Sequence, residues 1–211
     1  MKVLVLGAGG HGQVVADILR SQRAAGEPLS FNGYLDDRQG IRPDGNGTVL
    51  GAIHQWSSFS HDGIIVAIGD NATRKKQFDV LTTAGARFVT ARHPSTTVAS
   101  DVSIGTGSML CAGVIINTQA CIGANTIINT GASIDHHCRI GDHVHVAPGV
   151  RLGGNVEIGD GALVGIGAIV LPGTKVGAWA TVGAGAVVTK DVAARTTVVG
   201  VPARVLTPMG R

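Results

Sequence analysis

Two patterns of apolar and polar residues divide the chain near residue 92. In the first part, short apolar runs alternate with stretches in which apolar residues recur every three or four positions. The runs predict strands, and the recurring spacing predicts helices. We expect strands at 2–6, 31–35, 64–68 and 87–90, helices at 13–22 and 73–84, and a glycine- and aspartate-rich loop at 39–51. Strands and helices that alternate in this way predict a small parallel α/β sheet.

From Val98 onward, an aliphatic residue occupies every sixth position, sixteen times in succession. These residues are Val98, Ile104, Leu110, Ile116, Ile122, Ile128, Ile134, Ile140, Val146, Leu152, Ile158, Val164, Val170, Val176, Val182 and Val188. The residue four positions after each is small or of modest size, and glycine often follows the aliphatic residue directly. Ordinary alternating strands have a period of two with turns at variable places, so they would not keep a six-residue phase for about 95 residues.

The hexapeptide period is typical of a three-sided β-helix. Three hexapeptides complete one coil, so residues 18 apart stack and the aliphatic side chains fill the interior. The open ends of such a prism need protection. We therefore expect a left-handed parallel β-helix at 93–211, with the α/β domain at 1–92 covering one end. The chain after Asp191 is expected to cover or flank the other end.

Composition agrees with narrow interior layers, because 32 of the 211 residues are glycine and only 3% are aromatic. Lys plus Arg total 17 and Asp plus Glu total 14, spread over both halves, which argues against nucleic-acid binding. The cysteines, Cys111, Cys121 and Cys138, lack metal-site or disulfide spacing and favour a reducing compartment. We find no signal peptide and no apolar stretch of about 18 residues, so we expect no membrane insertion.

A glycine loop follows the first expected strand. Gly7, Gly9 and Gly12 satisfy the pattern G-x-G-x-x-G, and Asp36 follows the second strand. Alone, this pattern indicates a domain that binds a nicotinamide dinucleotide. Only about 90 residues precede the repeats, which is too few for the two halves of a dinucleotide fold. Half of that fold can hold one nucleotide, with its diphosphate at the helix N-terminus. The alternative is that the glycines serve only a tight turn.

Four histidines, His136, His137, His143 and His145, lie within ten residues. They could be solvated corner residues, zinc ligands as in a lyase of the carbonic anhydrase type, or they could include a catalytic base. Imidazole, with an unperturbed pKa of about 6.5, can accept a proton at neutral pH. A zinc site would need three histidines within about 2.1 Å of one point.

Prism geometry separates two of these histidines. Ile134, Ile140 and Val146 mark the three successive faces, which we name after them. His136 falls at the corner between the Ile134 and Ile140 faces, and His145 points outward from the Val146 face. This corner lies opposite the Val146 face, so the two histidines of one chain cannot meet. They can meet between chains that pack side by side, as in a cyclic trimer.

Six motifs together carry a resemblance to a known family. They are Gly7-Ala8-Gly9-Gly10-His11-Gly12, Tyr34-Leu35-Asp36-Asp37, Ala67-Ile68-Gly69-Asp70-Asn71, Ile128-Asn129-Thr130, Ile134-Asp135-His136-His137-Cys138 and Gly200-Val201-Pro202-Ala203-Arg204. Over its whole length the chain resembles the hexapeptide-repeat acyltransferases. It is most similar to the PglD-like and NeuD-like branch, which contains bacterial acetyltransferases of nucleotide-linked 4-amino sugars and relatives of sialic-acid O-acetyltransferases.

The resemblance implies an N-acetyltransferase that uses acetyl-CoA as co-substrate, without a metal. The acceptor it implies is a nucleotide-linked amino sugar, expected to be a UDP-4-amino-4,6-dideoxy sugar of bacterial glycan biosynthesis. It also implies a cytoplasmic homotrimer with active sites between subunits. The alternatives are O-acetylation of a sugar or sialic acid, a zinc-dependent lyase, and a non-catalytic nucleotide-sugar-binding or scaffold protein.

The resemblance also implies roles for individual residues. His136 is expected to be the base that takes a proton from the sugar amine. The family usually has a carboxylate directly after this base, whereas this chain has His137; Asp135 could substitute, although adjacent residues point in different directions. The nucleotide sugar is expected to contact Gly9, Gly10, His11, Asp36, Asp37, Gly69 and Asn129. Acetyl-CoA is expected to contact His145, Gly154, Ile166, Gly183 and Ala184.

Overall fold

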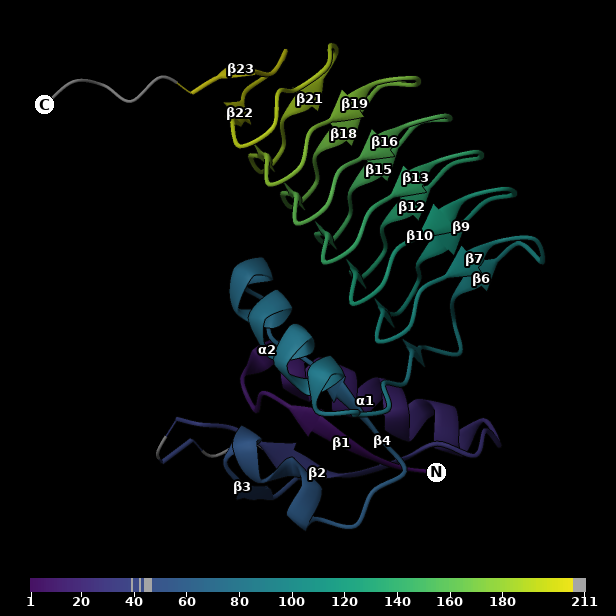
Figure 1. The fold of residues 1–211 in the computed structure, drawn as a ribbon. Coiled ribbons are helices and arrows are strands. Elements are labelled where there is room, and N and C mark those ends of the chain that lie inside the picture. The colour runs from purple at the N-terminus through teal and green to yellow at the C-terminus, as the bar shows by residue number, and fades with distance from the viewer. Residues whose placement is uncertain (39, 42, 44–46, 207–211) are drawn as a thin grey trace, which may run out of the picture.

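The N-terminal part of the chain is a four-stranded parallel sheet with helices on both faces. The computed structural model describes residues 1–38, 40–41, 43 and 47–206. The strand order is β3-β2-β1-β4, with β1 at Lys2–Leu6, β2 at Ser30–Leu35, β3 at Val49–Gly51 and β4 at Gly63–Val66. The helices are α1 (Gly10–Ala24), α2 (Asn71–Thr83) and a 3-10 helix at Ile53–Ser58. Figure 1 shows this domain beside the first coils of the second domain.

Alternation along β1 explains why the strand is apolar throughout. Val3 and Val5 pack toward α1, whereas Leu4 and Leu6 pack with Leu81 of α2 on the opposite face. A parallel sheet covered by helices on both faces buries every residue of a central strand, so such a strand reads as a continuous apolar run.

Several details of the α/β domain differ from the sequence-based expectation. Strand β4 ends at Val66 rather than at residue 68, and α2 begins at Asn71 rather than at residue 73. The expected loop at 39–51, of which 39, 42 and 44–46 lie outside the described residues, ends in edge strand β3. The expected strand at 87–90 supplies only a single bridge, Phe88 to Ile64, before the chain continues into β5 (Ala91–Arg92). Helix α1 begins at Gly10, three residues before the expected start at residue 13. A three-residue strand and a glycine-rich first turn carry no apolar period to detect.

The second domain is the expected left-handed parallel β-helix. Its Ile134 face contains β6 (Thr97–Val98), β9 (Ile115–Ile116), β12 (Ser133–Ile134), β15 (Arg151–Leu152), β18 (Ile169–Val170) and β21 (Val187–Val188). Its Ile140 face contains β7 (Ser103–Ile104), β10 (Cys121–Ile122), β13 (Arg139–Ile140), β16 (Glu157–Ile158) and β19 (Lys175–Val176). Its Val146 face contains β5, β8 (Met109–Leu110), β11 (Ile127–Ile128), β14 (His145–Val146), β17 (Leu163–Val164), β20 (Thr181–Val182), β22 (Thr197–Val199) and β23 (Arg204–Val205).

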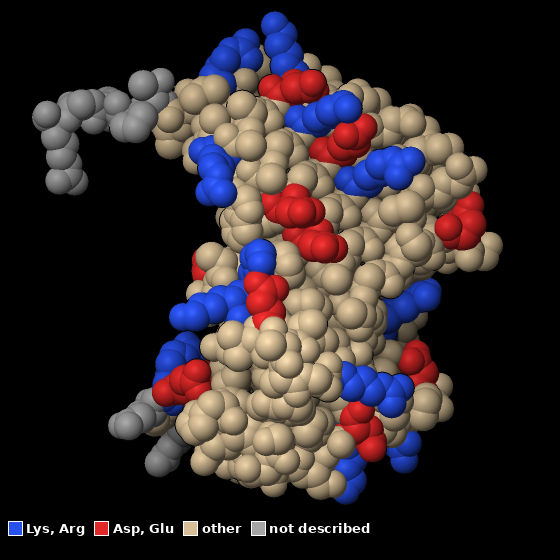
Figure 2. Space-filling view, in the orientation of Figure 1, with Lys and Arg blue, Asp and Glu red and all other residues tan. Residues whose placement is uncertain are grey.

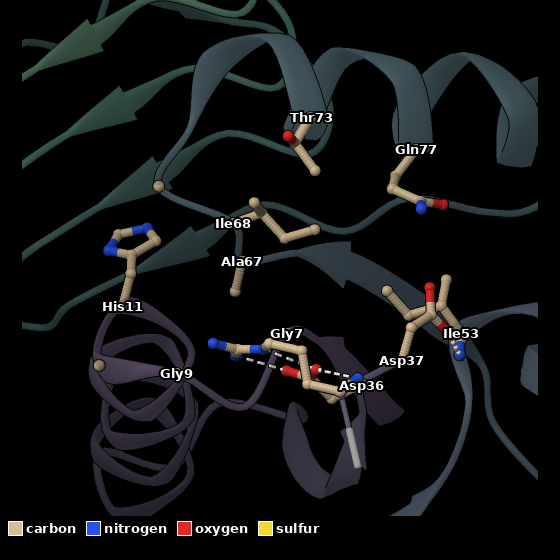
Figure 3. Close-up of a pocket in the computed structure, with 13 residues that line it drawn as sticks. Gly7, Gly9, His11, Asp36, Asp37, Ile53, Ala67, Ile68, Thr73 and Gln77 are labelled. Carbon is tan, nitrogen blue, oxygen red and sulfur yellow. Dashed lines mark hydrogen bonds and ion pairs between the residues drawn. The ribbon is translucent and has the colours of Figure 1, made fainter. Parts of the chain in front are cut away.

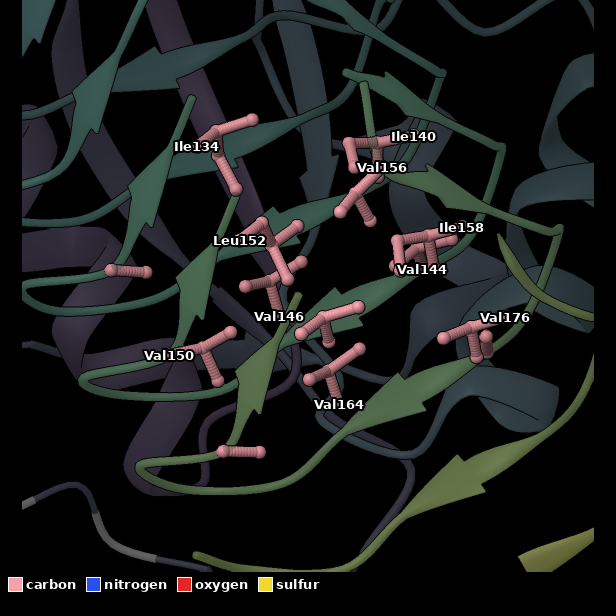
Figure 4. Packing of buried hydrophobic residues seen from close by; sticks show 14 of the residues in the cluster. Ile134, Ile140, Val144, Val146, Val150, Leu152, Val156, Ile158, Val164 and Val176 are labelled. Atoms are coloured by element: carbon pink, nitrogen blue, oxygen red, sulfur yellow. The ribbon is translucent and has the colours of Figure 1, made fainter. Parts of the chain in front are cut away.

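Stacking at 18-residue intervals builds the core of the prism. Val146 pairs with Ile128 below and Val164 above, and the same register repeats on the other faces. Figure 4 shows these aliphatic side chains pointing into the interior, where nearly all of them are buried. The corner residues Asn125, His143 and Trp179 have φ of 53°, 59° and 60°, the left-handed conformation that Gly107 and Gly161 adopt at the same corner of other coils. The aliphatic positions predicted to be interior are thus confirmed.

The α/β domain packs against a side of the β-helix. Met109, Cys111 and Ile127 point outward from the Val146 face, where they join Val15 and Leu19 of α1 in one buried cluster. Helix α1 is therefore enclosed between its own sheet and the first coils. We expected this domain to cover one end, but the contacts lie on a side face, because the six-residue period does not indicate what covers an outward-facing side chain.

The last strands extend the Val146 face. Strand β22 pairs with β20, and β23 folds back antiparallel onto β22. On the face of the molecule shown in Figure 2, acidic and basic side chains are interspersed. Among the ion pairs of the β-helix, Lys175 lies 3.2 Å from Glu157. None of the described helices is long and apolar enough to cross a membrane.

Candidate active site

A cavity of about 490 Å³ opens at the carboxyl ends of β1, β2 and β4. It is lined by Gly7, Gly9, Gly10, His11, Asp36, Asp37, Arg38, Ile53, Ala67, Ile68, Gly69, Thr73 and Gln77. Figure 3 shows the α1 side and the Asp36 side below this cavity, with Thr73 and Gln77 of α2 above it. Six of the seven residues expected to contact the nucleotide sugar lie here, and we call it the nucleotide cavity.

The glycines of the first loop have separate physical roles. Gly7 has φ +105°, and a Cβ on Gly12 would lie 1.9 Å from the Gly7 carbonyl oxygen, so both glycines allow α1 to start close against β1. A Cβ on Gly10 would meet no protein atom within 4 Å. Helix α1 has neither a side-chain cap nor an acidic residue in its first turn. Its free N–H groups and helix dipole therefore favour an anion in the cavity.

The carboxylate of Asp36 holds the guanidinium of Arg38 near the N-terminus of α1. It accepts hydrogen bonds from Ala8 N (2.7 Å), Arg38 N (2.9 Å) and the Arg38 guanidinium (2.8 and 3.0 Å). Burial would raise the pKa of Asp36, but the hydrogen bonds from Arg38 and Ala8 outweigh it and lower the pKa to about 2. A Cβ on Gly9 would lie 3.1 Å from Arg38. Sequence reasoning missed Arg38, although a cation two residues after Asp36 was a usable signal.

The second carboxylate of the pair also has a partner within the protein. Asp37 Oδ1 accepts the backbone N–H of Ile53 at 2.8 Å, which ties the end of β2 to the 3-10 helix. Both carboxylates thus organise the cavity wall.

A second cavity, of about 720 Å³, runs along the Val146 face. Its lining comprises Gly69, Asp70, Asn71, Ala72, Asn129, His145, Ala147, Pro148, Gly161, Leu163, Gly165, Ile166, Trp179, Thr181 and Ala184. Three of the residues expected to contact acetyl-CoA, His145, Ile166 and Ala184, are among them, and Asn129 lies here rather than in the nucleotide cavity. We call this the β-helix cavity.

Two of the expected acetyl-CoA contacts lie elsewhere. A Cβ on Gly183 would lie 2.7 Å from Cγ1 of Val199, so β22 covers this glycine. A Cβ on Gly154 would lie 2.5 Å from the ring of His136, which places Gly154 at the opposite corner of the prism.

The two cavities share Gly69, and two imidazoles lie where they approach each other. The ring centroids of His11 and His145 are 6.2 Å apart. His145 Nε2 lies 3.2 Å from Asn129 Nδ2, whereas His11 Nε2 is buried without a hydrogen-bond partner among the described residues. Burial, together with His145 and Arg74, lowers the pKa of His11 to about 3. Burial and Arg74 likewise lower the pKa of His145 to about 4. A hydrogen bond with the backbone of Gly69 raises this pKa but does not offset the lowering. Both rings are therefore neutral at pH 7.

His136 lies exposed at the corner between the Ile134 and Ile140 faces. Its Nδ1 is 3.0 Å from Nδ1 of His137. Asp135 Oδ1 accepts the backbone N–H of His136 at 2.7 Å and the side-chain amide of Asn117 at 2.9 Å. The ring of His136 thus contacts His137, and the hydrogen bonds of Asp135 go to the backbone and to Asn117.

The remaining histidine of the cluster is structural. His143 is buried, with Nδ1 2.9 Å from the amide of Asn125 and its ring edge-on to Phe78 of α2 at 5.6 Å. In the described part of the chain, no group of three His, Cys, Asp or Glu side chains is placed to hold a metal ion.

Comparisons with known proteins agree with this architecture. The family model of the PglD N-terminal domain matches residues 2–81, and that of the bacterial transferase hexapeptide (six repeats) matches residues 120–154 and 155–190. None of the curated proteins matches the chain.

Solved structures match the chain over nearly its whole length. The acetyltransferase domain of PglB from Neisseria gonorrhoeae FA1090, in complex with acetyl coenzyme A, is 34% identical with a TM-score of 0.90, covering 97% of this chain and 98% of that one. A mutant of the GDP-perosamine N-acetyl transferase from Caulobacter crescentus, in complex with CoA and GDP-perosamine, is 36% identical with a TM-score of 0.88, covering 98% and 97%. WeeI from Acinetobacter baumannii AYE is 32% identical with a TM-score of 0.85, covering 98% and 100%. Since both domains and their order are shared with these proteins, the chain belongs to the PglD-like branch of the hexapeptide-repeat acyltransferases.

Proposed function

We propose that this enzyme transfers the acetyl group of acetyl-CoA to the amino group of a nucleotide-linked amino sugar. The observation that carries the proposal is the meeting of the two cavities at Gly69, beside His11 and His145. A nucleotide bound at the N-terminus of α1 would extend its sugar toward this junction. The unpartnered Nε2 of His11 calls for a polar ligand atom there, because buried polar atoms are normally hydrogen-bonded.

The reaction needs one proton acceptor. The nitrogen lone pair of the amine attacks the thioester carbonyl carbon, the C–S bond breaks, and the amine proton must leave. The low pKa of His145 makes it a poor acceptor at neutral pH, so it is suited to hydrogen bonding. We assign the base to Nε2 of His136, with Nδ1–H donating to His137, and the proton then passes to the departing CoA thiolate.

The role that we assign to His136 implies a second copy of the chain. The β-helix cavity runs along the Val146 face and the nucleotide cavity meets it at Gly69, whereas His136 lies at the opposite corner of its own prism. We therefore propose a homotrimer in which His136 of one chain completes the site of its neighbour. Exposed aliphatic residues on and beside the Ile134 face, Ile115, Ile169 and Leu171, offer an apolar surface next to that corner for such packing. Gly154, beside His136, would then reach acetyl-CoA from the second chain.

For the nucleotide we propose uridine diphosphate, on the resemblance of the Gly9-Gly10-His11 loop and the Asp36-Asp37 pair. We also propose the domain boundary between residues 92 and 93, at the end of β5, whose Ala91 packs in the α1 cluster while the strand pairs with β8 of the β-helix.

Acetyl-CoA turnover tests the function directly. Purified protein is mixed with acetyl-CoA and UDP-, GDP- or dTDP-linked 4-amino sugars, free thiol is measured, and the product is identified by mass. We expect thiol release only with an amino sugar nucleotide, fastest with the UDP sugar, and one acetyl group on nitrogen. Faster turnover with a GDP sugar would contradict uridine as the nucleobase of the substrate. Acetylation of a hydroxyl-bearing analogue would contradict N-acetylation.

Subunit mixing tests the shared site. His136→Ala and His145→Ala proteins are each assayed alone and after subunit exchange. We expect mixed trimers to regain activity, because some of their sites combine both native histidines. Two inactive parents that exchange subunits without recovery would place the whole site in one chain.

A further inference from the structure

One short segment forms a wall of both cavities. Ala67, Ile68 and Gly69 line the nucleotide cavity, and 69–72 lines the β-helix cavity. The segment joins β4 to α2, and Gly69 also contacts the ring of His145. Its position relative to the β-helix therefore sets the distance between the two proposed substrates.

A buried cation fixes this segment. Arg74 of α2 is fully buried, and its guanidinium NH1 donates to the carbonyl oxygens of Ile68 (2.9 Å) and Gly69 (3.2 Å). From the same group, Nε donates to Asn125 O (3.0 Å), and NH2 donates to His143 O (2.7 Å). The first two acceptors belong to the shared wall. The other two belong to the β-helix corner between the Ile140 and Val146 faces.

Asn71 extends the same contact along that corner. Its Oδ1 accepts from Arg74 NH2 at 2.8 Å, and its Nδ2 donates to the carbonyl oxygens of Gly161 (3.0 Å) and Ala162 (3.1 Å). Consecutive coils are thus joined to the first turn of α2 by two side chains. The corner carbonyls of Asn125 and His143 accept no backbone hydrogen bond in the described chain, so Arg74 satisfies groups that would otherwise be buried and unpaired.

Filling the buried position of Arg74 would not require a charged side chain. No carboxylate of the described chain forms an ion pair with it, and burial lowers its pKa to about 10. A buried charge without an ion-pair partner is costly, and apolar residues can often replace buried ionic groups without loss of stability. A rigid fork of five N–H donors, however, can hold carbonyl groups from two domains at once.

We propose that Arg74 is a positioning residue that holds the shared wall against the β-helix and so aligns the sugar amine with the acetyl thioester. The inference rests on the proposed function. It predicts that Arg74 contributes to turnover and to the effect that one bound substrate has on the affinity for the other. Its contribution to the affinity for either substrate alone is small.

Arg74→Lys is the main test variant, because it keeps the charge but replaces the five-donor fork with a single nitrogen. We expect kcat to fall by about 10- to 100-fold, since misplacement of about 1 Å has effects of this size. The Kd of each substrate, measured in the absence of the other, should stay within about threefold of wild type. Titration of the sugar nucleotide with and without saturating CoA measures the coupling. We expect CoA to change its affinity at least about fivefold in wild type and by less than about twofold in the variant.

Lys76→Gln is the matched control, because Lys76 is an exposed cation on the same helix; its kcat and coupling should equal those of wild type. Arg74→Gln removes the charge as well, and if it does not fold, Arg74→Lys still decides the question. Folded Arg74→Lys with wild-type kcat and coupling would overturn the inference, as would a loss confined to the affinity for one substrate measured alone. Wild-type protein that bound neither CoA nor any sugar nucleotide would overturn the proposed function itself.

Discussion

Gly154 offers a direct test of whether the position of His136 controls catalysis. A Cβ at this glycine would lie 2.5 Å from Cε1 and 2.7 Å from Nε2 of His136. Carbon atoms in ordinary contact are about 3.5–4.0 Å apart, so in Gly154→Ala the ring must move by about 1 Å. Because a shift of about 1 Å can lower a rate about 100-fold, we expect kcat to fall by roughly 10- to 100-fold.

The kinetic constants separate this effect from the loss of an acetyl-CoA contact. Displacement of the base should lower kcat with KM for acetyl-CoA unchanged, whereas a lost contact should raise KM. Thiol release at varied acetyl-CoA, with the melting temperature as a check on folding, provides both constants. Wild-type kcat in a folded Gly154→Ala protein would refute the assignment of His136 as the base or the packing between these two residues.

Three further predictions concern the same site. His136→Ala should lower turnover by about 10²- to 10⁴-fold with KM for acetyl-CoA nearly unchanged, and near-normal thiol release would remove its role as base. Gly10→Val should weaken sugar-nucleotide binding and spare acetyl-CoA binding in calorimetric titrations, because its side chain would enter open space in the nucleotide cavity; equal affinity for the sugar nucleotide would show that the loop is only a turn. The pKa of His11 falls from 6.5 to about 3 and that of His145 to about 4, so the unfolded state binds more protons below pH 6.5, and stability should decrease as pH falls from 6.5 to 4. Each ring contributes up to about 1.4 kcal/mol per pH unit to the free energy of unfolding. This free energy, measured by urea unfolding at several pH values, should depend less steeply on pH in His11→Gln than in wild type. An equally steep dependence would show that His11 is not buried as described.

The sequence alone was sufficient for the β-helix, because its rule is local. Each coil pairs with the next at the same register, so one six-residue period fixes the strands, the interior positions such as Val146, and the outward position of His145. The glycine loop was equally readable, since Gly7 and Gly12 meet a steric requirement within one strand–helix unit. Edge strand β3 was missed because three residues cannot show a period.

Only the tertiary structure decided how the two domains meet. Met109 and Ile127 read as ordinary outward positions, yet they pack under α1, and this brings His11 next to His145, far away in the sequence. Nothing in the apolar pattern marks Arg74, because its partners are backbone carbonyl groups that every residue type carries. The sequence therefore determined the repeating core, which depends on a constant register. It also determined the glycine loop after β1, which depends on neighbouring residues. The junction of the cavities depends on the packing of helices against coils, which is set by side-chain shape and by hydrogen bonds between distant parts of the chain.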